Sequence, residues 1–156
     1  SHPHPWLVLS SDVRKKEDLS LRTTLYHLDE GGADAERTTD DPLDLVAVEV
    51  AKRDINAFGL GITVGRTRNN DIVINDERIS RFHAFFQLRD GAWVVSDAGS
   101  KNGTTVEGDR LDPRKPCILP DRSSVDFGGY RARFFQPASF LEFLRRSAPR
   151  GAARNP

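Results

Sequence analysis

Short apolar runs alternate with polar turns along most of the chain, from residue 43 to residue 135. The runs are rich in β-branched and aromatic residues, which is typical of strands. They cover residues 43–50, 62–64, 72–74, 84–88, 92–96, 104–106, 110–111, 117–119, 124–127 and 130–135. Asp90-Gly91 and Glu107-Gly108 mark tight hairpin turns between neighbouring runs. Strands this short and this numerous predict an all-β sandwich rather than alternating strand–helix units.

Beyond Pro137 the apolar spacing changes from that of strands to that of a helix. Ser139 is placed to cap this helix, and Arg145-Arg146 fall in its last turn, where cations interact favourably with the helix dipole. The apolar positions are Phe140, Leu141, Phe143 and Leu144. We therefore expect a short C-terminal α-helix over residues 137–147 and a disordered tail over residues 148–156.

The N-terminal part of the chain is less regular. Trp6-Leu7-Val8-Leu9 is compatible with a strand, whereas residues 29–42 are acidic, contain Gly and Thr, and have few apolar side chains. Such a composition is typical of a mobile linker. The sequence therefore predicts a partly disordered N-terminal extension over residues 1–42 and a sandwich domain over residues 43–136.

Composition limits the partners of the domain. The 156 residues carry 23 Lys and Arg against 23 Asp and Glu, so no net charge draws the protein towards nucleic acid or a membrane surface. Any site for an anion must therefore be built locally. His2 and His4 lie between prolines at the start of the chain, where we expect neither a metal site nor a cofactor.

The single cysteine, Cys117, cannot form an internal disulfide, and we expect it to be a small core residue. No signal peptide or membrane-spanning stretch is recognisable, so a cytoplasmic location is expected. The chain has no Met and begins with Ser1-His2, which indicates a fragment or a cloning remnant.

Three polar islands lie between the apolar runs, and their side chains suit a phosphate group. Arg66 offers a forked donor, Ser80 a hydroxyl and a backbone N–H, and Lys101 a movable charge. Asn102 is both donor and acceptor, so it can bind the backbone of an extended peptide. A phosphothreonine carries a charge of about −1.5 to −2 and three acceptor oxygens. The islands therefore predict a site for a phosphorylated peptide.

The same islands match a known sequence signature. In order along the chain they are Gly65-Arg66, Ser80-Arg81-Phe82-His83 and Ser100-Lys101-Asn102-Gly103-Thr104. Two further segments, Asn70-Asp71-Ile72 and Val125-Asp126-Phe127-Gly128, fit the same signature. This set resembles the forkhead-associated (FHA) domain, over about residues 43–135. The resemblance implies an eleven-stranded β-sandwich whose loops at one end bind phosphothreonine peptides without catalysis.

The resemblance also implies roles for individual residues. Arg66 and Ser80 would contact the phosphate, Arg81 and Lys101 would support phosphate or peptide contacts, and Asn102 would hold the peptide backbone.

Other positions in the signature would support or extend the site. His83 would be a buried brace for the Ser80 loop, and Gly65, Gly103 and Thr104 would shape the loops. Arg78 lies where the family often reads the third residue after the phosphothreonine, and a cation there would favour an acidic or polar partner residue.

Two other functions remain open from the sequence. A phosphate-independent scaffold or oligomerisation domain could use the same fold. Ser80 and His83 could form the nucleophile and base of a hydrolase, although no oxyanion motif or positioned carboxylate accompanies them. We favour the binding module.

The expected partner is a phosphothreonine-containing protein, either a Ser/Thr kinase or its substrate, in a bacterial-type signalling system. Thr38-Thr39-Asp40-Asp41 in the N-terminal extension suggests one further ligand. Phosphorylation of Thr38 or Thr39 would produce a tethered ligand at high effective concentration, which could dock into the domain's own loops or those of a neighbour.

Overall fold

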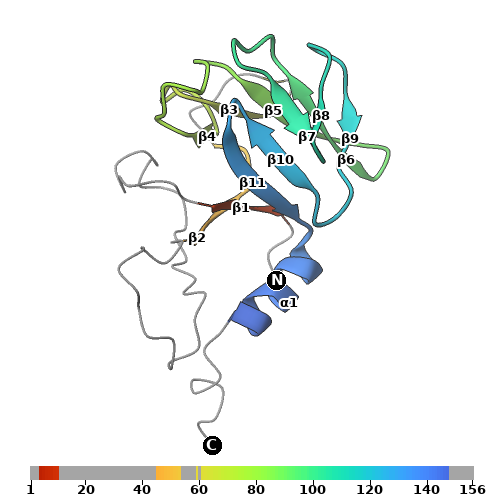
Figure 1. Ribbon diagram of the computed structural model, residues 1–156. Helices are drawn as coiled ribbons and strands as arrows, with labels where there is room; N and C mark the ends of the chain where they lie inside the picture. Colours follow the sequence, from red (N-terminus) through yellow and green to blue (C-terminus); the bar gives the residue numbers. More distant parts are fainter. Residues whose placement is uncertain (1–3, 11–44, 54–58, 60, 148–156) are drawn as a thin grey trace, which may run out of the picture.

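The computed structural model describes residues 4–10, 45–53, 59 and 61–147 (Figure 1). In these residues eleven strands form two sheets, and one helix follows the last strand. This arrangement confirms the predicted sandwich with a C-terminal helix. The predicted linker at 29–42, the Thr38-Thr39 pair and the tail at 148–156 lie outside the described residues.

The larger sheet has six strands. Their order across the sheet is β2 (Leu45–Glu49), β1 (Trp6–Ser10), β11 (Tyr130–Phe135), β10 (Ser124–Phe127), β7 (Thr104–Val106) and β8 (Asp109–Arg110). The neighbouring strands of this sheet are antiparallel.

The smaller sheet has five strands. Their order is β4 (Ile72–Val73), β3 (Ile62–Gly65), β5 (Ala84–Arg89), β6 (Ala92–Asp97) and β9 (Cys117–Ile118). In the described residues of this sheet, β3 and β4 are parallel and the other neighbouring strands are antiparallel.

Tight turns set the register of both hairpins that the sequence predicts. At the β5–β6 turn Asp90 and Gly91 have φ values of 50° and 78°, and at the β7–β8 turn Glu107 and Gly108 have values of 50° and 82°. Two consecutive residues with positive φ form the turn that matches the twist of two-residue hairpins. The turns therefore bring Arg89 opposite Ala92.

The core lies between the two sheets. Phe86 of β5 packs edge-on against Phe127 of β10, with ring centroids 6.3 Å apart, and lies parallel to Phe134 of β11 at 6.4 Å. All three rings are fully buried. Trp93 and Cys117, both expected in the core, are partly buried and pack against its edge.

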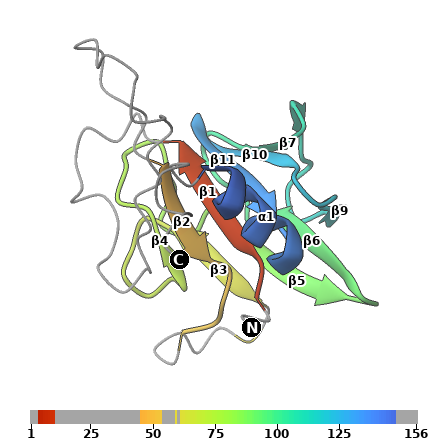
Figure 2. The same cartoon turned by 90° about the horizontal axis from the view of Figure 1, so that it is seen from below.

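The helix α1 (Pro137–Ser147) lies against the outer face of the larger sheet, beside β1 and β11 (Figure 2). Phe140 stacks on Trp6 of β1, with ring centroids 4.6 Å apart and an angle of 12° between the planes. This contact makes a second apolar cluster separate from the main core.

The helix begins at Pro137, but its capping differs from the prediction. The expected cap, Ser139, is in the first turn, because the helix begins at Pro137 and Gln136 accepts the first intrahelical bond from Phe140. Proline suits this first position because its missing N–H would have no intrahelical partner. The Ser139 hydroxyl instead donates to Asp121, whose other oxygen accepts the Gln136 N–H at 2.8 Å.

Candidate binding site at one end of the sandwich

Three loops and one turn meet at one end of the sandwich. The Arg66 N–H donates to the Ser80 carbonyl at 3.0 Å, which joins the β3–β4 and β4–β5 loops. The Lys101 N–H donates to the Ser80 hydroxyl at 3.0 Å, which adds the β6–β7 loop. The Gly128 N–H of the β10–β11 turn donates to the Gly103 carbonyl at 2.9 Å. The islands that are separate in the sequence are therefore neighbours in space.

His83 is fully buried behind this cluster. Its Nδ1 accepts the Ser80 N–H at 3.0 Å, so its Nε2 carries the proton and donates to the Gly103 carbonyl at 2.9 Å. Burial lowers the pKa of His83 below its ordinary value, and the Gly103 carbonyl and the charges of Asp97 and Asp126 only partly oppose this effect. The imidazole is therefore neutral and joins two loops.

This geometry argues against the hydrolase alternative. A general base must have a free ring nitrogen facing the nucleophile. Both nitrogens of His83 are bonded to backbone groups, and the Ser80 hydroxyl accepts a bond from Lys101 instead. The Ser80 hydroxyl proton remains available to donate to a ligand.

Asp97, at the end of β6, organises the loop that carries Lys101 and Asn102. Its carboxylate accepts hydrogen bonds from the Gly99 and Ser100 N–H groups, the Ser100 hydroxyl and the Thr104 hydroxyl, at 2.5 to 3.0 Å. Burial alone would raise the pKa of Asp97, but these hydrogen bonds outweigh burial and lower it. The sequence analysis did not single out Asp97, although it lies only two residues before Gly99.

Asn70 fixes the other side of the site. Its side-chain amide donates to the Arg81 carbonyl at 2.7 Å and to the Thr67 carbonyl at 2.9 Å. Gly65 lies so close to this bridge that a Cβ on it would be 2.2 Å from the Arg81 carbonyl oxygen. Glycine is therefore required here by close approach of the backbone.

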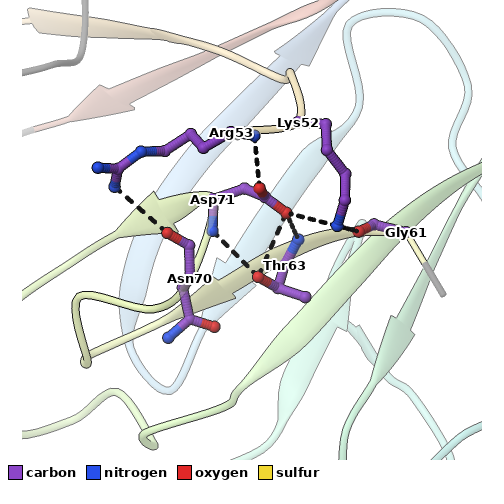
Figure 3. A network of polar contacts seen from close by, with 6 residues as sticks. All are labelled: Lys52, Arg53, Gly61, Thr63, Asn70 and Asp71. Carbon is purple, nitrogen blue, oxygen red and sulfur yellow. Dashed lines mark hydrogen bonds and ion pairs between the residues drawn. The ribbon is translucent and has the colours of Figure 1, made fainter. Parts of the chain in front are cut away.

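A polar network ties this loop to the segment after β2 (Figure 3). The Asp71 carboxylate accepts the N–H groups of Arg53 at 2.6 Å and Thr63 at 2.8 Å, and Lys52 lies 3.5 Å from it. The Arg53 guanidinium donates to the Asn70 carbonyl at 3.3 Å. The loop that presents Arg66 is therefore anchored from behind by a buried carboxylate.

The cations at the site differ in their partners. The side chains of Arg66, Arg81 and Lys101 form no hydrogen bond or ion pair with any other residue that the structure describes. Arg81 and Lys101 are exposed, and Arg66 is half-buried. These cations are held on braced loops and are free to meet an anion.

Two other predicted residues already have partners. Asn102 donates through its amide nitrogen to the Arg78 carbonyl at 2.9 Å, which leaves its side-chain oxygen for other contacts. Arg78 forms an ion pair with Asp76 at 2.9 Å. Asp76 did not enter the predicted site.

Metal-binding clusters and membrane-spanning helices are both absent from the residues that the structure describes. No group of three or more His, Cys, Asp and Glu side chains in them is arranged to hold a metal ion. No helix among them is long and apolar enough to cross a bilayer.

Together, the cluster defines a module that binds an anionic partner through loops at the end of a sandwich. Residues 62–128 match the family model of the FHA domain. This part of the chain is therefore an FHA domain, a phosphothreonine-binding module.

Similar proteins include bacterial regulators. The oxoglutarate dehydrogenase inhibitor of Corynebacterium diphtheriae is 38% identical over 74 residues, which are 47% of this chain and 50% of that protein. The glycogen accumulation regulator GarA of Mycolicibacterium smegmatis is 36% identical over 72 residues, 46% of this chain and 44% of that protein. The chain thus spans half or less of the length of these relatives.

A solved structure shares the fold. The FHA domain of a Chlamydia trachomatis protein superposes with a TM-score of 0.52 at 21% identity, over 85% of this chain and 97% of that one. At this identity the likeness describes the architecture alone.

Proposed function

We propose that this chain binds phosphothreonine in a partner protein through Arg66, Ser80, Arg81, Lys101 and Asn102. The observation that carries the proposal is the Ser80 hydroxyl, which the Lys101 N–H holds in place at 3.0 Å beside cations that have no partner in the described residues. A phosphate there would accept from the hydroxyl and from the cations together. Gly65, His83, Gly103 and Thr104 would support these residues without touching the ligand.

The binding free energy expected from these residues corresponds to a reversible complex. A hydrogen bond to a charged group contributes about 1.5–3 kcal/mol. Two or three of them, less the cost of ordering a flexible peptide, support affinities on the order of micromolar. Since net charge is zero, this affinity must come from the local cations.

Calorimetry with the whole chain tests the proposal. A phosphothreonine peptide should bind, and its unphosphorylated form should not. Arg66→Ala should lower the affinity at least about tenfold, which is the loss of one charge-assisted bond. Arg89→Ala is the matched control. Arg89 is exposed and is the last residue of β5, at the end of that strand away from His83 and the loops. Equal binding of the unphosphorylated peptide would favour the scaffold alternative instead.

The folded unit in this proposal includes β1 and α1. β1 lies between β2 and β11 in the larger sheet, and Phe140 of α1 stacks on Trp6 of β1. The predicted boundary at residue 43 would remove β1 from its sheet. Binding experiments should therefore use the chain from its first residue.

The partner would be a Ser/Thr kinase or its substrate. The curated relatives are bacterial regulators, which favours a signalling system of that type. A cytoplasmic location agrees with this role, because protein kinases take ATP as the phosphate donor.

A tethered ligand from the chain itself is compatible with the strand register. Leu45 of β2 pairs with Ser10 of β1, and the neighbouring Leu9 pairs with Ala132 of β11. Ala132 is two residues after the start of β11, and β11 starts at the β10–β11 turn, which borders the site. β2 therefore begins at the site end of the sandwich. Thr39 precedes Leu45 by a span of at most about 20 Å of extended chain. The length of the chain between them and Leu45 would therefore let phosphorylated Thr38 or Thr39 start from the site end of the sandwich.

Competition tests this self-docking. The chain phosphorylated at Thr39 should bind an external phosphothreonine peptide more weakly than the unphosphorylated chain. The same treatment of a Thr38→Ala/Thr39→Ala variant should leave the affinity unchanged. Equal affinities for the phosphorylated and unphosphorylated wild-type chains would rule out self-docking.

A further inference from the structure

The arginines around the loops differ in whether an acidic side chain pairs with them, and Arg78 is paired with Asp76. Its Nε and Nη2 donate to the two oxygens of Asp76 at 3.0 and 2.9 Å, and its Nη1 donates to the Gly129 carbonyl at 3.3 Å. The guanidinium also lies 5.5 Å from the centre of the Tyr130 ring. Its charge is therefore offset by a carboxylate, and its position is fixed from several sides.

The ion pair between Asp76 and Arg78 is present at neutral pH. The hydrogen bond from the Arg78 side chain lowers the pKa of Asp76, and the effect exceeds the opposing influence of burial. Asp76 is therefore ionised whenever the domain is folded near neutral pH. An acidic side chain that approached Arg78 would meet the like charge of this carboxylate, which weakens their attraction.

Arg110 presents the opposite situation. It lies in β8, the edge strand of the larger sheet, and it is exposed. Its guanidinium covers Gly103, because a Cβ built on Gly103 would lie 2.9 Å from the Arg110 Cζ. Gly103 has a φ of 84° and directly follows Asn102, so this guanidinium borders the loop that would hold the peptide backbone.

Arg110 also has no acidic neighbour in contact. Its side chain forms no ion pair or hydrogen bond with another residue in the described ranges. Like Arg66, Arg81 and Lys101, it is a cation beside the site whose charge is not compensated. The sequence signature did not indicate Arg110, because this residue lies outside the islands. The pairing of β7 with β8 brings it to the Gly103 loop.

We propose that Arg110, and not Arg78, selects an acidic side chain beside the phosphothreonine of the ligand. The inference rests on the proposed function, since it concerns the residues that flank the phosphate. Arg110 can pair with a ligand carboxylate that meets no competing acid there, whereas a carboxylate that approaches Arg78 is repelled by the charge of Asp76. The pair would be at the solvent-exposed rim, so its effect is modest, about threefold in affinity.

A peptide series tests the assignment on the whole chain. The parent phosphothreonine peptide has alanine at every flanking position. In each variant peptide a single Asp replaces one of these alanines, and its affinity is compared with that of the peptide with Asn at the same position. The wild-type chain should prefer Asp over Asn about threefold at one position. Arg110→Gln should abolish this preference, and Arg78→Gln should keep it. Arg89→Gln, the same change of charge at the far end of β5, should keep it too.

A second variant tests the role of Asp76. Asp76→Asn removes the charge that compensates Arg78, so a second position of the peptide should acquire a preference for Asp. Thermal unfolding of each variant checks that the domain is folded. If Arg78→Gln fails to fold, the Arg110→Gln result alone decides the assignment, because Arg110 is exposed on an edge strand.

The outcomes separate the two proposals. If the all-alanine phosphothreonine peptide does not bind the wild-type chain, the proposed function and this inference both fail. If that peptide binds but no position prefers Asp, only this inference fails. It also fails alone if the preference survives Arg110→Gln.

Discussion

The Nδ1 atom of His83 accepts the backbone N–H of Ser80 at 3.0 Å, while Nε2 of the same ring donates to the Gly103 carbonyl at 2.9 Å. One buried side chain thus joins two loops that the proposed ligand would bridge from the other side. In the proposed complex the hydroxyl of Ser80 would contact the ligand, while the backbone N–H of Ser80 is bound by His83. Ser80 is thus proposed to bind the phosphate, and His83 to position Ser80.

Replacing His83 by alanine should lower both stability and binding. The change leaves the Ser80 N–H without its acceptor and opens a cavity at a fully buried position. The free energy of unfolding should fall by about 2–4 kcal/mol, as measured by urea denaturation. Ser80→Ala is the comparison: it should weaken phosphopeptide binding at least about tenfold with little change in unfolding. A His83→Ala chain as stable as the wild type would contradict the bracing role.

The stability of the domain should decrease in mild acid because of His83. Its folded-state pKa lies below the ordinary value of 6.5, so between the two values the unfolded chain binds more protons than the folded chain. The contribution of neutral His83 is therefore complete above the unfolded pKa and is lost as pH falls towards the folded pKa. Urea denaturation at a series of pH values from 7.5 to 5 should show this decline. Binding is a poorer readout, because the phosphate itself titrates near pH 6.

Gly65→Ala should disrupt the site although it adds one methyl group. The new Cβ would lie 2.2 Å from the Arg81 carbonyl oxygen and 2.5 Å from the Asn70 amide nitrogen, so the two loops must separate. We expect phosphopeptide affinity to fall more than about tenfold and the melting temperature to fall by several degrees. Gly59→Ala is the matched control, since nothing lies within 4 Å of its Cβ position. Normal binding by Gly65→Ala would show that the loops tolerate this separation.

Trp6→Ala should destabilise the domain at a distance from the site. Trp6 is 2% exposed and stacks on Phe140 at 4.6 Å. Loss of a large buried aromatic costs about 3–5 kcal/mol. Leu141→Ala, on the exposed side of the same helix, should change the free energy of unfolding by less than about 0.5 kcal/mol. Phosphopeptide affinity of the folded Trp6→Ala chain should be unchanged, and a large loss there would tie β1 to the loops.

Much of the fold was predictable from the sequence because its signals are local. Alternating apolar runs and positive-φ turns such as Asp90-Gly91 depend on neighbouring residues, and the strands and hairpins appear where the pattern predicts them. The helix over residues 137–147 was also predicted, but its cap was not. The cap was misplaced because Ser139 and Gln136 bind Asp121, which is eighteen and fifteen residues away from them in the chain.

The site was predictable only in part. The islands show which residues carry cations and hydroxyls, since these lie in short recognisable motifs. They do not show which cations are already paired. Whether Arg78 is engaged depends on Asp76 and on the β10–β11 turn, and whether Arg110 reaches the loop depends on the β7–β8 hairpin. The Asp76–Arg78 pair is local, but the contacts with the β10–β11 turn and the β7–β8 hairpin arise from the packing of strands that are distant in the sequence.

The position of β1 has a consequence for how the protein is made. Trp6 pairs with Phe135, so one of the first strands to be synthesised must wait for the last one before the larger sheet can close. Pairing between such distant segments is entropically costly and slows folding. During translation β1 therefore remains an apolar segment without its final neighbour. A nascent chain that stalls before β11 would expose this segment to chaperones and to aggregation.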